Sequence, residues 1–236
     1  MNATNLINLQ KSRSKDKMKV LELFAGSRSI GKVCDEKGYD VFSSDWKLFD
    51  GIDYAVDVLD FDVSKVPFVP DVIWASPPCT TFSVASIGRY WNKDRTPKHE
   101  KAELGINLLI KTISIIKHFK SINPNLVWYI ENPRGMMRKM SIWDNIMHVR
   151  HTVTYCQYGD TRMKPTDIWT NNTDWSPRPS CKNGDSCHIS APRGSRTGTQ
   201  GLKGNYERSI VPRELCKEVM ESSWHTYLRK TETISN

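Results

Sequence analysis

The stretch MKVLELFAG, residues 18–26, gives the clearest indication of the fold of this chain. Its apolar run predicts a buried strand from Met18 to Phe24, and the Ala-Gly pair that follows predicts a tight turn. Ser29 to Lys37 then has the pattern of a helix, which Gly38 closes. Tyr39 to Asp45 is predicted to be a second strand. A strand, turn, helix and strand in this order form the first unit of a parallel sheet that helices cover.

The same alternation continues toward the middle of the chain. DVIWA (residues 71–75) and LVWYI (residues 126–130) are short apolar runs that predict two more buried strands. Between them, Glu100 to Lys120 is predicted to form a long amphipathic helix that ends before Pro124. Its apolar stripe is expected to hold Leu104, Leu108, Ile115 and Phe119. We therefore predict an α/β fold with a Rossmann-like, mostly parallel sheet, in which ligands bind at the carboxyl ends of the strands.

Composition divides the chain into four parts. Residues 1–17 are polar and basic and are interpreted as a flexible arm, and residues 18–170 as the catalytic and cofactor-binding domain. Residues 171–209 are rich in Pro, Gly, Ser, Arg and Lys and lack periodicity, which is typical of a loop-rich insert that carries a binding function. Residues 210–236 are predicted to return to the catalytic domain through a helix over Val211 to Leu228, with a proline in its first turn.

The bulk composition excludes several classes of protein. Hydrophobic residues make up 38% of the 236 residues, which is enough for a core and excludes wholesale disorder. The formal net charge of +8 is compatible with a polyanionic partner but does not require one. No segment approaches the roughly 18 apolar residues of a membrane helix, and the N-terminus does not resemble a signal peptide, so we expect a cytoplasmic protein. Six cysteines are too few for a disulfide framework.

Two predicted strands end in residues that suit one reaction. Cys79 follows DVIWA behind two prolines, and Glu131 follows LVWYI, so we expect both side chains to face one pocket. A thiolate that adds to carbon 6 of cytosine makes carbon 5 nucleophilic toward a sulfonium methyl donor, and a carboxylic acid at ring N3 offsets the developing charge. The base has to leave the duplex stack for this chemistry. Taken singly, Cys79 also fits a small buried residue, and Glu131 a solvated strand end.

Short motifs follow one another in order along residues 20–220. They are Leu21 to Gly26, Ser44-Asp45-Trp46, Val56-Asp57-Val58, Pro77-Pro78-Cys79 with Thr80-Thr81-Phe82-Ser83, Glu131-Asn132-Pro133, Tyr158-Gly159 and, more weakly, Gly204-Asn205 to Val219. Together they resemble the motifs of the cytosine carbon-5 DNA methyltransferase family, especially its compact, phage-like members. The resemblance implies an S-adenosylmethionine-dependent methyltransferase fold and a DNA (cytosine-5-)-methyltransferase of the kind found in phages and restriction-modification systems.

The resemblance implies a role for each matched residue. It makes Cys79 the nucleophile, Glu131 the partner of ring N3, and Arg162, from the eighth motif, a contact of the target base. It makes S-adenosylmethionine the cofactor, bound by Phe24, Ala25, Gly26, Ser27, Asp45, Trp46, Asp57, Val58 and Pro78. The expected nucleic-acid contacts are Ser83, Arg89, Asn132, Lys164, Arg193 and Arg196.

The cofactor residues also have physical interpretations of their own. A turn at Gly26 lets a ligand approach the backbone closely, and Asp45, about 20 residues further on, suits ribose hydroxyls. Trp46 can stack on adenine, and Asp57 can accept a hydrogen bond from the adenine amino group. Taken singly, either aspartate also fits an ordinary turn residue.

The chain departs from the family pattern at two places. Arg28 stands where the family usually has glycine, and it is expected either to lean over the donor's carboxylate or to point to solvent. In the eighth motif, Lys164 falls on the first of the family's two arginines and Thr166 on the second. Arg162 is expected to serve from a shifted register.

The insert takes the place of the family's target-recognition region. It offers Arg178, Lys182, Arg193, Arg196 and Lys203. Arginine suits bidentate recognition of guanine, and phosphate contact alone is the alternative.

The insert also holds three residues of metal-binding type. They are Cys181, Cys187 and His188, which fall short of the four ligands of a zinc site and lack a C-x-x-C pair. We therefore expect no metal site.

Two other functions fit the same residues. The Pro-Cys and Glu-Asn pairing is shared by a branch of the family that methylates transfer RNA. A catalytically silent DNA-binding protein is the other alternative, although intact Cys79 and Glu131 argue against it. Methylation of an exocyclic amino group is disfavoured, because such enzymes place an aromatic residue after Pro-Pro where this chain has Cys79. We expect a monomer that acts on double-stranded DNA.

Overall fold

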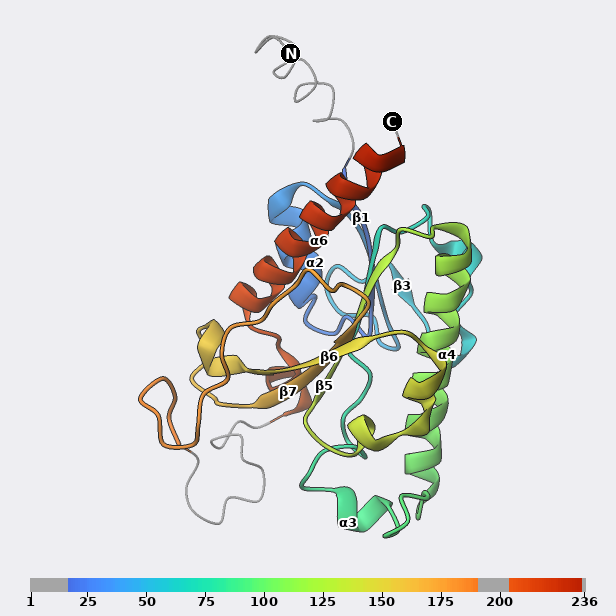
Figure 1. Ribbon diagram of the computed structural model, residues 1–236. Coiled ribbons are helices and arrows are strands. Elements are labelled where there is room, and N and C mark those ends of the chain that lie inside the picture. Colours follow the sequence, from blue (N-terminus) through green and yellow to red (C-terminus); the bar gives the residue numbers. More distant parts are fainter. Residues whose placement is uncertain (1–16, 191–203, 235–236) are drawn as a thin grey trace.

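The computed structural model describes residues 17–190 and 204–234 and contains a seven-stranded sheet (Figure 1). The strand order is β3-β2-β1-β4-β5-β7-β6. The pairs from β3 to β5 are parallel, whereas β7 runs antiparallel to both of its neighbours. The strands are β1 (Lys19–Leu23), β2 (Asp40–Asp45), β3 (Tyr54–Ala55), β4 (Val72–Ala75), β5 (Val127–Pro133), β6 (Val149–Thr154) and β7 (Pro165–Thr170).

Helices cover both faces of the sheet. In Figure 1, α4 lies on one side and α2 with α6 on the other, which makes three layers. The helices are α2 (Ser29–Lys37), α3 (Ile87–Tyr90), α4 (Glu100–Ile122), α5 (Asn205–Ser209) and α6 (Arg213–Ile234). Short 3-10 turns make the remaining connections: η1 (Val58–Asp60), η2 (Val63–Lys65), η3 (Met136–Lys139), η4 (Ser141–Asn145) and η5 (Tyr155–Tyr158).

The apolar strand runs fill two cores at once. Successive residues of a strand point to opposite faces, so Leu21 and Ile73 pack on the α4 side while Val20 and Trp74 pack on the side of α2 and α6. Each of these side chains is at most 1% exposed. Burial on both faces explains why these strands are continuous apolar runs. The predicted α/β fold with a mostly parallel sheet is confirmed.

Local turn signals predict the first half of the chain well. The predicted helix has the bounds of α2, and Gly38 ends it with φ 70°, in the left-handed region that favours glycine. The predicted strands that correspond to β1, β2 and β4 agree with the structure to within one residue at each end. These elements bring the loops after β1, β2 and β4 to one edge of the sheet.

The predicted apolar stripe of α4 is wrong at one position. Leu104 is 46% exposed, whereas Ala102, Gly105 and Leu109 are buried. The reason is a close approach at Gly105, where an added Cβ would lie 2.8 Å from Oγ1 of Thr81. The helix therefore turns its glycine, and not Leu104, toward the loop that follows β4.

Three strands were not expected from the sequence: the short β3, and β6 and β7, which change the surroundings of Glu131. β7 pairs with β5, and β6 pairs with β7, both in antiparallel register. Pairing of Glu131 with Ile168 and of Asn132 with Asp167 extends β5 through Pro133. Glu131 therefore lies within a strand and not after it.

The closing part of the chain is a long helix. α6 begins two residues later than predicted and continues to Ile234, and it packs on α2. Residues 171–190 contain no helix or strand, as expected of a loop-like insert, whereas Asn205–Ser209, assigned to the same insert, form α5. The predicted basic arm lies outside the described residues except for Lys17, and the division into domains stays a prediction. None of the described helices has the length and apolar character needed to cross a membrane.

Candidate active site

A pocket opens at the carboxyl ends of β1, β2 and β4. Phe24, Asp45, Trp46, Asp57, Val58 and Pro78, all predicted cofactor residues, line it together with Leu23, Ser44, Val56 and Leu108. Ala25, Gly26 and Ser27, also predicted, form the loop behind it, and Ala25 and Ser27 are buried. The pocket thus lies at the edge of the sheet where the sequence placed it.

The loop after β1 is fastened to the end of β2. The backbone N–H of Ala25 donates to the carbonyl of Ser44 (3.0 Å), and that of Gly26 donates to Oδ2 of Asp45 (2.9 Å). Phe24 and Gly26 both have positive φ, 55° and 47°. A left-handed conformation is costly for Phe24, and these hydrogen bonds hold it there with its side chain against the pocket.

A carboxylate of the protein itself occupies the N-terminus of α2. Glu22, 2% exposed, accepts hydrogen bonds from the backbone N–H groups of Ile30 (3.0 Å) and Gly31 (3.1 Å). Burial raises the pKa of Glu22 to about 7, although the hydroxyl of Ser43 and the two N–H groups counteract this. The helix end is therefore not available to a phosphate, in contrast to dinucleotide-binding folds.

Arg28 takes neither of its two expected positions. Its Nε donates to Oγ of Ser43 (3.2 Å), and Nη1 forms an ion pair with Asp35 (3.1 Å). The side chain is only 15% exposed and lies against Gly31 and Gly51. Arg28 is thus a packing residue on α2, away from solvent and not among the residues that line the pocket.

The pocket combines an exposed ring with two carboxylates. Trp46 is 75% exposed at its edge, which leaves the indole face open to a planar ligand. Asp45 is buried, and burial raises its pKa, while Asp57 uses Oδ1 to accept the N–H of Leu59 (2.9 Å). This lining suits an uncharged or cationic nucleoside rather than a phosphorylated one.

The loop after β4 carries Cys79 past the pocket. Pro78 lines the pocket, and the next residue, Cys79, is half-buried beside it. The backbone N–H groups of Phe82 and Ser83 both donate to the Cys79 carbonyl at 3.0 Å, which closes the loop into a turn. Asn132, which has no exposed surface, donates through Nδ2 to the carbonyl of Pro77 (2.8 Å). In this conformation Asn132 holds the Cys79 loop and does not reach the surface.

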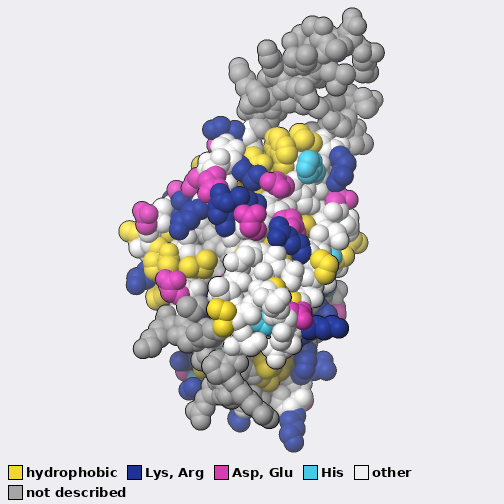
Figure 2. Space-filling model, turned by 90° about the vertical axis from the view of Figure 1, so that its left-hand side faces the viewer, with side chains coloured by type: hydrophobic (Ala, Val, Ile, Leu, Met, Phe, Trp, Pro, Cys, Tyr) yellow, Lys and Arg dark blue, Asp and Glu magenta, His cyan; other side chains and the backbone are white. Residues whose placement is uncertain are grey.

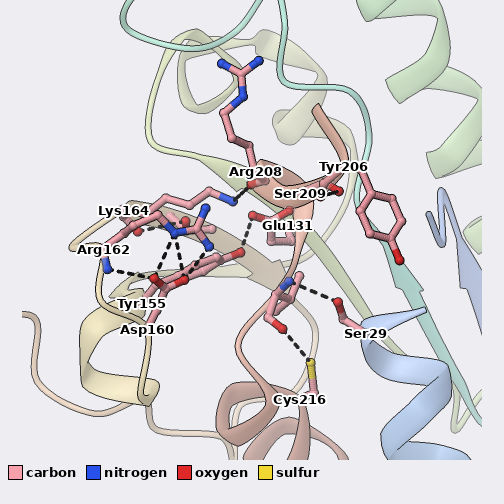
Figure 3. A network of polar contacts seen from close by, with 12 residues as sticks. Ser29, Glu131, Tyr155, Asp160, Arg162, Lys164, Tyr206, Arg208, Ser209 and Cys216 are labelled. Carbon is pink, nitrogen blue, oxygen red and sulfur yellow. Dashed lines mark hydrogen bonds and ion pairs between the residues drawn. The ribbon is translucent and has the colours of Figure 1, made fainter. Parts of the chain in front are cut away.

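Glu131 is oriented by a tyrosine that the sequence analysis did not single out. The hydroxyl of Tyr155, in η5, donates to Oε1 of Glu131 at 2.8 Å (Figure 3). Both side chains are buried, and burial together with the Glu131 charge raises the pKa of Tyr155 well above its usual value. Tyr155 therefore remains a hydrogen-bond donor. Its position three residues before the Tyr158-Gly159 motif was the one available signal.

Lys164 is the cation that acts most strongly on Cys79. Burial raises the pKa of the Cys79 thiol, Lys164 and Arg208 lower it, and Glu131 raises it. Nζ of Lys164 donates to the carbonyl of Arg208 (3.0 Å) and lies 4.4 Å from the centre of the Tyr155 ring (Figure 3). Burial lowers the pKa of Lys164, and the charges of Glu131 and Cys79 raise it. The structure thus brings Cys79, Glu131, Tyr155 and Lys164 together.

Arg162 has a partner of its own. Its Nε donates to Oδ1 of Asp160 (2.9 Å), its Nη2 is also paired with Asp160, and the residue is 5% exposed (Figure 3). Nη1 of Arg162 is buried and has no hydrogen-bond partner. The predicted contact of Arg162 with a target base stays a prediction, because the side chain is paired with Asp160 in this structure.

Two of the other predicted nucleic-acid residues, Ser83 and Arg89, lie in the segment between β4 and α4. Arg89 is exposed on α3, with its guanidinium 5.3 Å from the ring centre of Tyr90. Ser83 is half-buried, and its hydroxyl lies 3.0 Å from that of Ser86. Arg193 and Arg196 lie outside the described residues.

Of the five basic residues named for the insert, Arg178 and Lys182 lie within the described part. Arg178 donates to Glu218 (2.9 Å) and to the carbonyl of Gln157 (2.8 Å), so it fastens the insert to α6 and η5. Lys182 is exposed. Lys203, which was named with Arg178 and Lys182 as a basic residue of the insert, lies outside the described residues.

Comparison with known proteins gives one relative of clear similarity. No model of a known protein family matches the chain. A probable DNA (cytosine-5)-methyltransferase of Frog virus 3 (isolate Goorha) is 33% identical over 179 residues, which are 72% of this chain and 78% of that protein.

Solved structures resemble the chain more distantly. The Entamoeba histolytica methyltransferase EhMeth matches 71% of this chain with a TM-score of 0.47 and 10% identity. A mutant of Spodoptera frugiperda DNMT2 matches 70% with a TM-score of 0.43 and 17% identity. The chain spans 58% and 54% of these two structures, little more than half of each. At these values the fold assignment depends on this chain's own sheet order.

Proposed function

The chain belongs to the cytosine carbon-5 DNA methyltransferase family, and from that premise we propose that it methylates carbon 5 of cytosine in double-stranded DNA. One observation carries the proposal. Pro78 lines the pocket, and Cys79 is the next residue. The charge of Lys164 lowers the pKa of the Cys79 thiol, and the charge of Glu131 raises it. The proposed pocket for the methyl donor and the proposed nucleophile for the base therefore involve two consecutive residues.

The residues around the pocket fit S-adenosylmethionine. Trp46 offers an open ring face for adenine, Asp45 a buried carboxylate for the ribose hydroxyls, and Asp57 a carboxylate for the adenine amino group. Glu22 fills the helix end that a phosphate would need, and this cofactor carries no phosphate. When bound, the cofactor supplies an electrophilic methyl group on sulfur.

Cys79 and Glu131 have complementary tasks in the proposed reaction. The Cys79 thiolate forms a bond to carbon 6 of the flipped cytosine, and electron density moves to ring N3 and carbon 5. Glu131, held by Tyr155, donates a hydrogen bond at N3 in its protonated form and so offsets the charge that builds there. Carbon 5 gains the methyl group as the carbon–sulfur bond of the donor breaks, which leaves a neutral thioether. Carbon 5 then gives its proton to water, and the electrons of that C–H bond expel the Cys79 sulfur from carbon 6. The thiolate is thereby regenerated.

Lys164 supports the nucleophile in this scheme. A half-buried thiol ionises less readily than one in water, and a nearby ammonium opposes this effect. By count, Lys164 occupies the place of the family's first eighth-motif arginine. We assign it the task of stabilising the Cys79 thiolate, while Arg162 stays a predicted contact of the base.

DNA is the proposed substrate for two reasons. The Frog virus 3 relative bears the name of a probable DNA methyltransferase, and the chain carries a net charge of +8. The face with α6 offers no uniform positive field, because Figure 2 shows acidic and basic side chains side by side on the face seen there. α6 itself forms ion pairs such as Arg213–Glu36 and Lys37–Glu221. We therefore expect nucleic acid on the edge that carries Cys79 and Arg89.

Methyl transfer from labelled S-adenosylmethionine tests the proposal. The protein is offered double-stranded DNA, transfer RNA and DNA with 5-fluorocytosine, and the labelled nucleoside is identified by mass spectrometry. We expect 5-methylcytosine in DNA and a covalent complex with the fluorinated DNA. Label in transfer RNA alone would overturn the DNA substrate, and efficient transfer without a trapped complex would overturn the Cys79 adduct.

A further inference from the structure

Four metal-binding side chains meet beside the candidate active site. Cys156 comes from η5, and Cys181, Cys187 and His188 come from the insert. Their ligand atoms, three Sγ and Nδ1 or Nε2 of the histidine, all lie within 4.8 Å of one another. Cys156 is therefore the fourth ligand that the sequence pattern lacked. The expectation of no metal site depended on that missing ligand and is no longer supported.

Three distances between these atoms are close to the edges of a tetrahedron around a metal ion. Cys156 Sγ lies 3.6 Å from Cys187 Sγ, and His188 Nδ1 lies 3.7 Å from Cys181 Sγ and 3.6 Å from Cys187 Sγ. Tetrahedral Zn²⁺ with its usual bond lengths requires about 3.8 Å between two sulfurs and about 3.6 Å between sulfur and nitrogen. The contact between Cys156 and Cys181, 3.0 Å, is shorter than such an edge. It is nevertheless far longer than the roughly 2.05 Å of a disulfide.

We propose that the chain binds one Zn²⁺ ion through Cys156, Cys181, Cys187 and His188. Three thiolates and one imidazole are a donor set for a closed structural zinc site, whereas Mg²⁺ and Ca²⁺ require oxygen ligands. Nδ1 of His188 faces two sulfurs, and its Nε2 is buried without a hydrogen-bond partner. Nε2 of Gln157 donates to Cys187 Sγ at 3.4 Å, as an outer-shell donor to a bound thiolate does.

A metal at this site would link the insert to η5, the turn that carries Tyr155. The described insert residues 171–190 contain no helix or strand, so a metal would supply order that the backbone does not. The backbone N–H of Cys181 donates to Oγ1 of Thr154 (3.0 Å), next to Tyr155, which orients Glu131. The N–H of Ile189 donates to the carbonyl of Thr161 (2.9 Å). Zinc binding does not depend on the proposed reaction, although it would position the segment predicted to contact DNA.

Metal analysis of the full-length protein, purified under reducing conditions, tests the site. We expect about one zinc per chain, and Co²⁺ in its place should give the visible absorption of a tetrahedral thiolate centre. His188→Ala and Cys187→Ser should weaken zinc binding by more than about 100-fold, the upper range for loss of a mere outer-shell partner. His188→Cys keeps four ligands and should retain zinc.

Cys34→Ala is the matched control, because Cys34 is buried in α2 outside the cluster. It should bind zinc like the unchanged protein. The measurement needs no substrate, so its result is independent of methyl transfer. Two results would overturn the site: less than about a tenth of an equivalent of zinc after reconstitution of the unchanged, reduced protein, or a Cys156–Cys181 disulfide found in that protein by mass spectrometry.

Discussion

The two halves of the sheet are stabilised in different ways. The parallel half, β3 to β4, is built around the apolar runs of β1 and β4, and its loops line the pocket. The carboxylates that it buries, Glu22 and Asp45, accept backbone N–H groups from the turn after β1 and the start of α2. The antiparallel half, β5 to β6, buries polar side chains such as Asp167, Thr166 and Asn172. Asp167 is 0% exposed and is paired with Arg138 and with Thr152. A buried polar group has to find its partner, and that partner is often distant in the chain.

The two halves also differ in the distance along the chain between the partners in the site. At the pocket, Gly26 and Asp45 are 19 residues apart; Gly26 lies in the turn after β1, and Asp45 ends the neighbouring strand β2. On the catalytic side, Tyr155 and Glu131 are 24 residues apart, and Asn132 and Pro77 are 55. Local sequence patterns therefore identify the cofactor site, whereas the catalytic site depends on pairings that no local pattern contains.

The largest effect is expected where the halves meet. Cys79→Ser should reduce methyl transfer at least about 1000-fold and leave affinity for S-adenosylhomocysteine unchanged, because the thiolate acts only in the chemical step. Steady-state kinetics and calorimetry would measure the two quantities. Cys34→Ala, with a buried cysteine of the parallel half, is the control. Full activity in Cys79→Ser would contradict the mechanism.

The second effect concerns the stability of the parallel half. The folded-state pKa of Glu22 is about 7, and the value without burial is 4.5. The protonated form is therefore favoured by folding, so its contribution is complete below pH 4.5 and is lost as pH rises to about 7. The loss is about 3 kcal/mol.

Denaturant unfolding between pH 4.5 and 8 would show this loss. The difference in unfolding free energy between the unchanged protein and Glu22→Gln removes the titration of all other groups. We expect that difference to change across the stated range and to level off above pH 7. Parallel curves for the two proteins would mean that Glu22 does not titrate there.

A third effect probes the polar network of the antiparallel half. Tyr155→Phe removes the donor to Glu131 and should lower the rate of transfer about 10- to 100-fold, with cofactor affinity unchanged. The matched control is Tyr158→Phe in the same turn, whose hydroxyl faces Glu218 and Arg178 instead. Equal losses in both variants would indicate a general weakening of η5 and not an effect on Glu131.

The smallest expected effect compares two aspartates of the parallel half. Asp57 accepts the N–H of Leu59 at the start of η1, and Asp62 accepts that of Ser64 at the start of η2, both at 2.9 Å. Asp57 also lines the pocket. Asp57→Ala should therefore weaken cofactor binding about 5- to 30-fold, whereas Asp62→Ala should leave it unchanged. Calorimetry with S-adenosylhomocysteine would decide, and equal affinities would exclude Asp57 from the pocket.

Sequence patterns alone predict the parallel half of the sheet and the loops that line the pocket. The runs before Phe24 and Ser76 predict buried strands because burial on both faces favours apolar residues, with Glu22 as the one buried carboxylate among them. Gly38 ends α2 as expected, because a helix end in the left-handed region favours glycine. The pocket and Cys79 follow from where those strands end.

The neighbours of Glu131, Cys79 and Cys156 became known only from the tertiary structure. β7 enters the sheet against β5 and places Glu131 inside a strand, Lys164 rather than Arg162 comes to act on Cys79, and Cys156 joins ligands from the insert. Spacing alone singled out Lys164 as a candidate, but the strand position of Glu131 and the meeting of Cys156 with the insert depend on which segments pair across the fold. The burial of a hydrophobic run can be predicted from the run itself. A buried polar side chain needs a hydrogen-bond partner, and the identity of that partner depends on which segments lie next to each other in the folded protein.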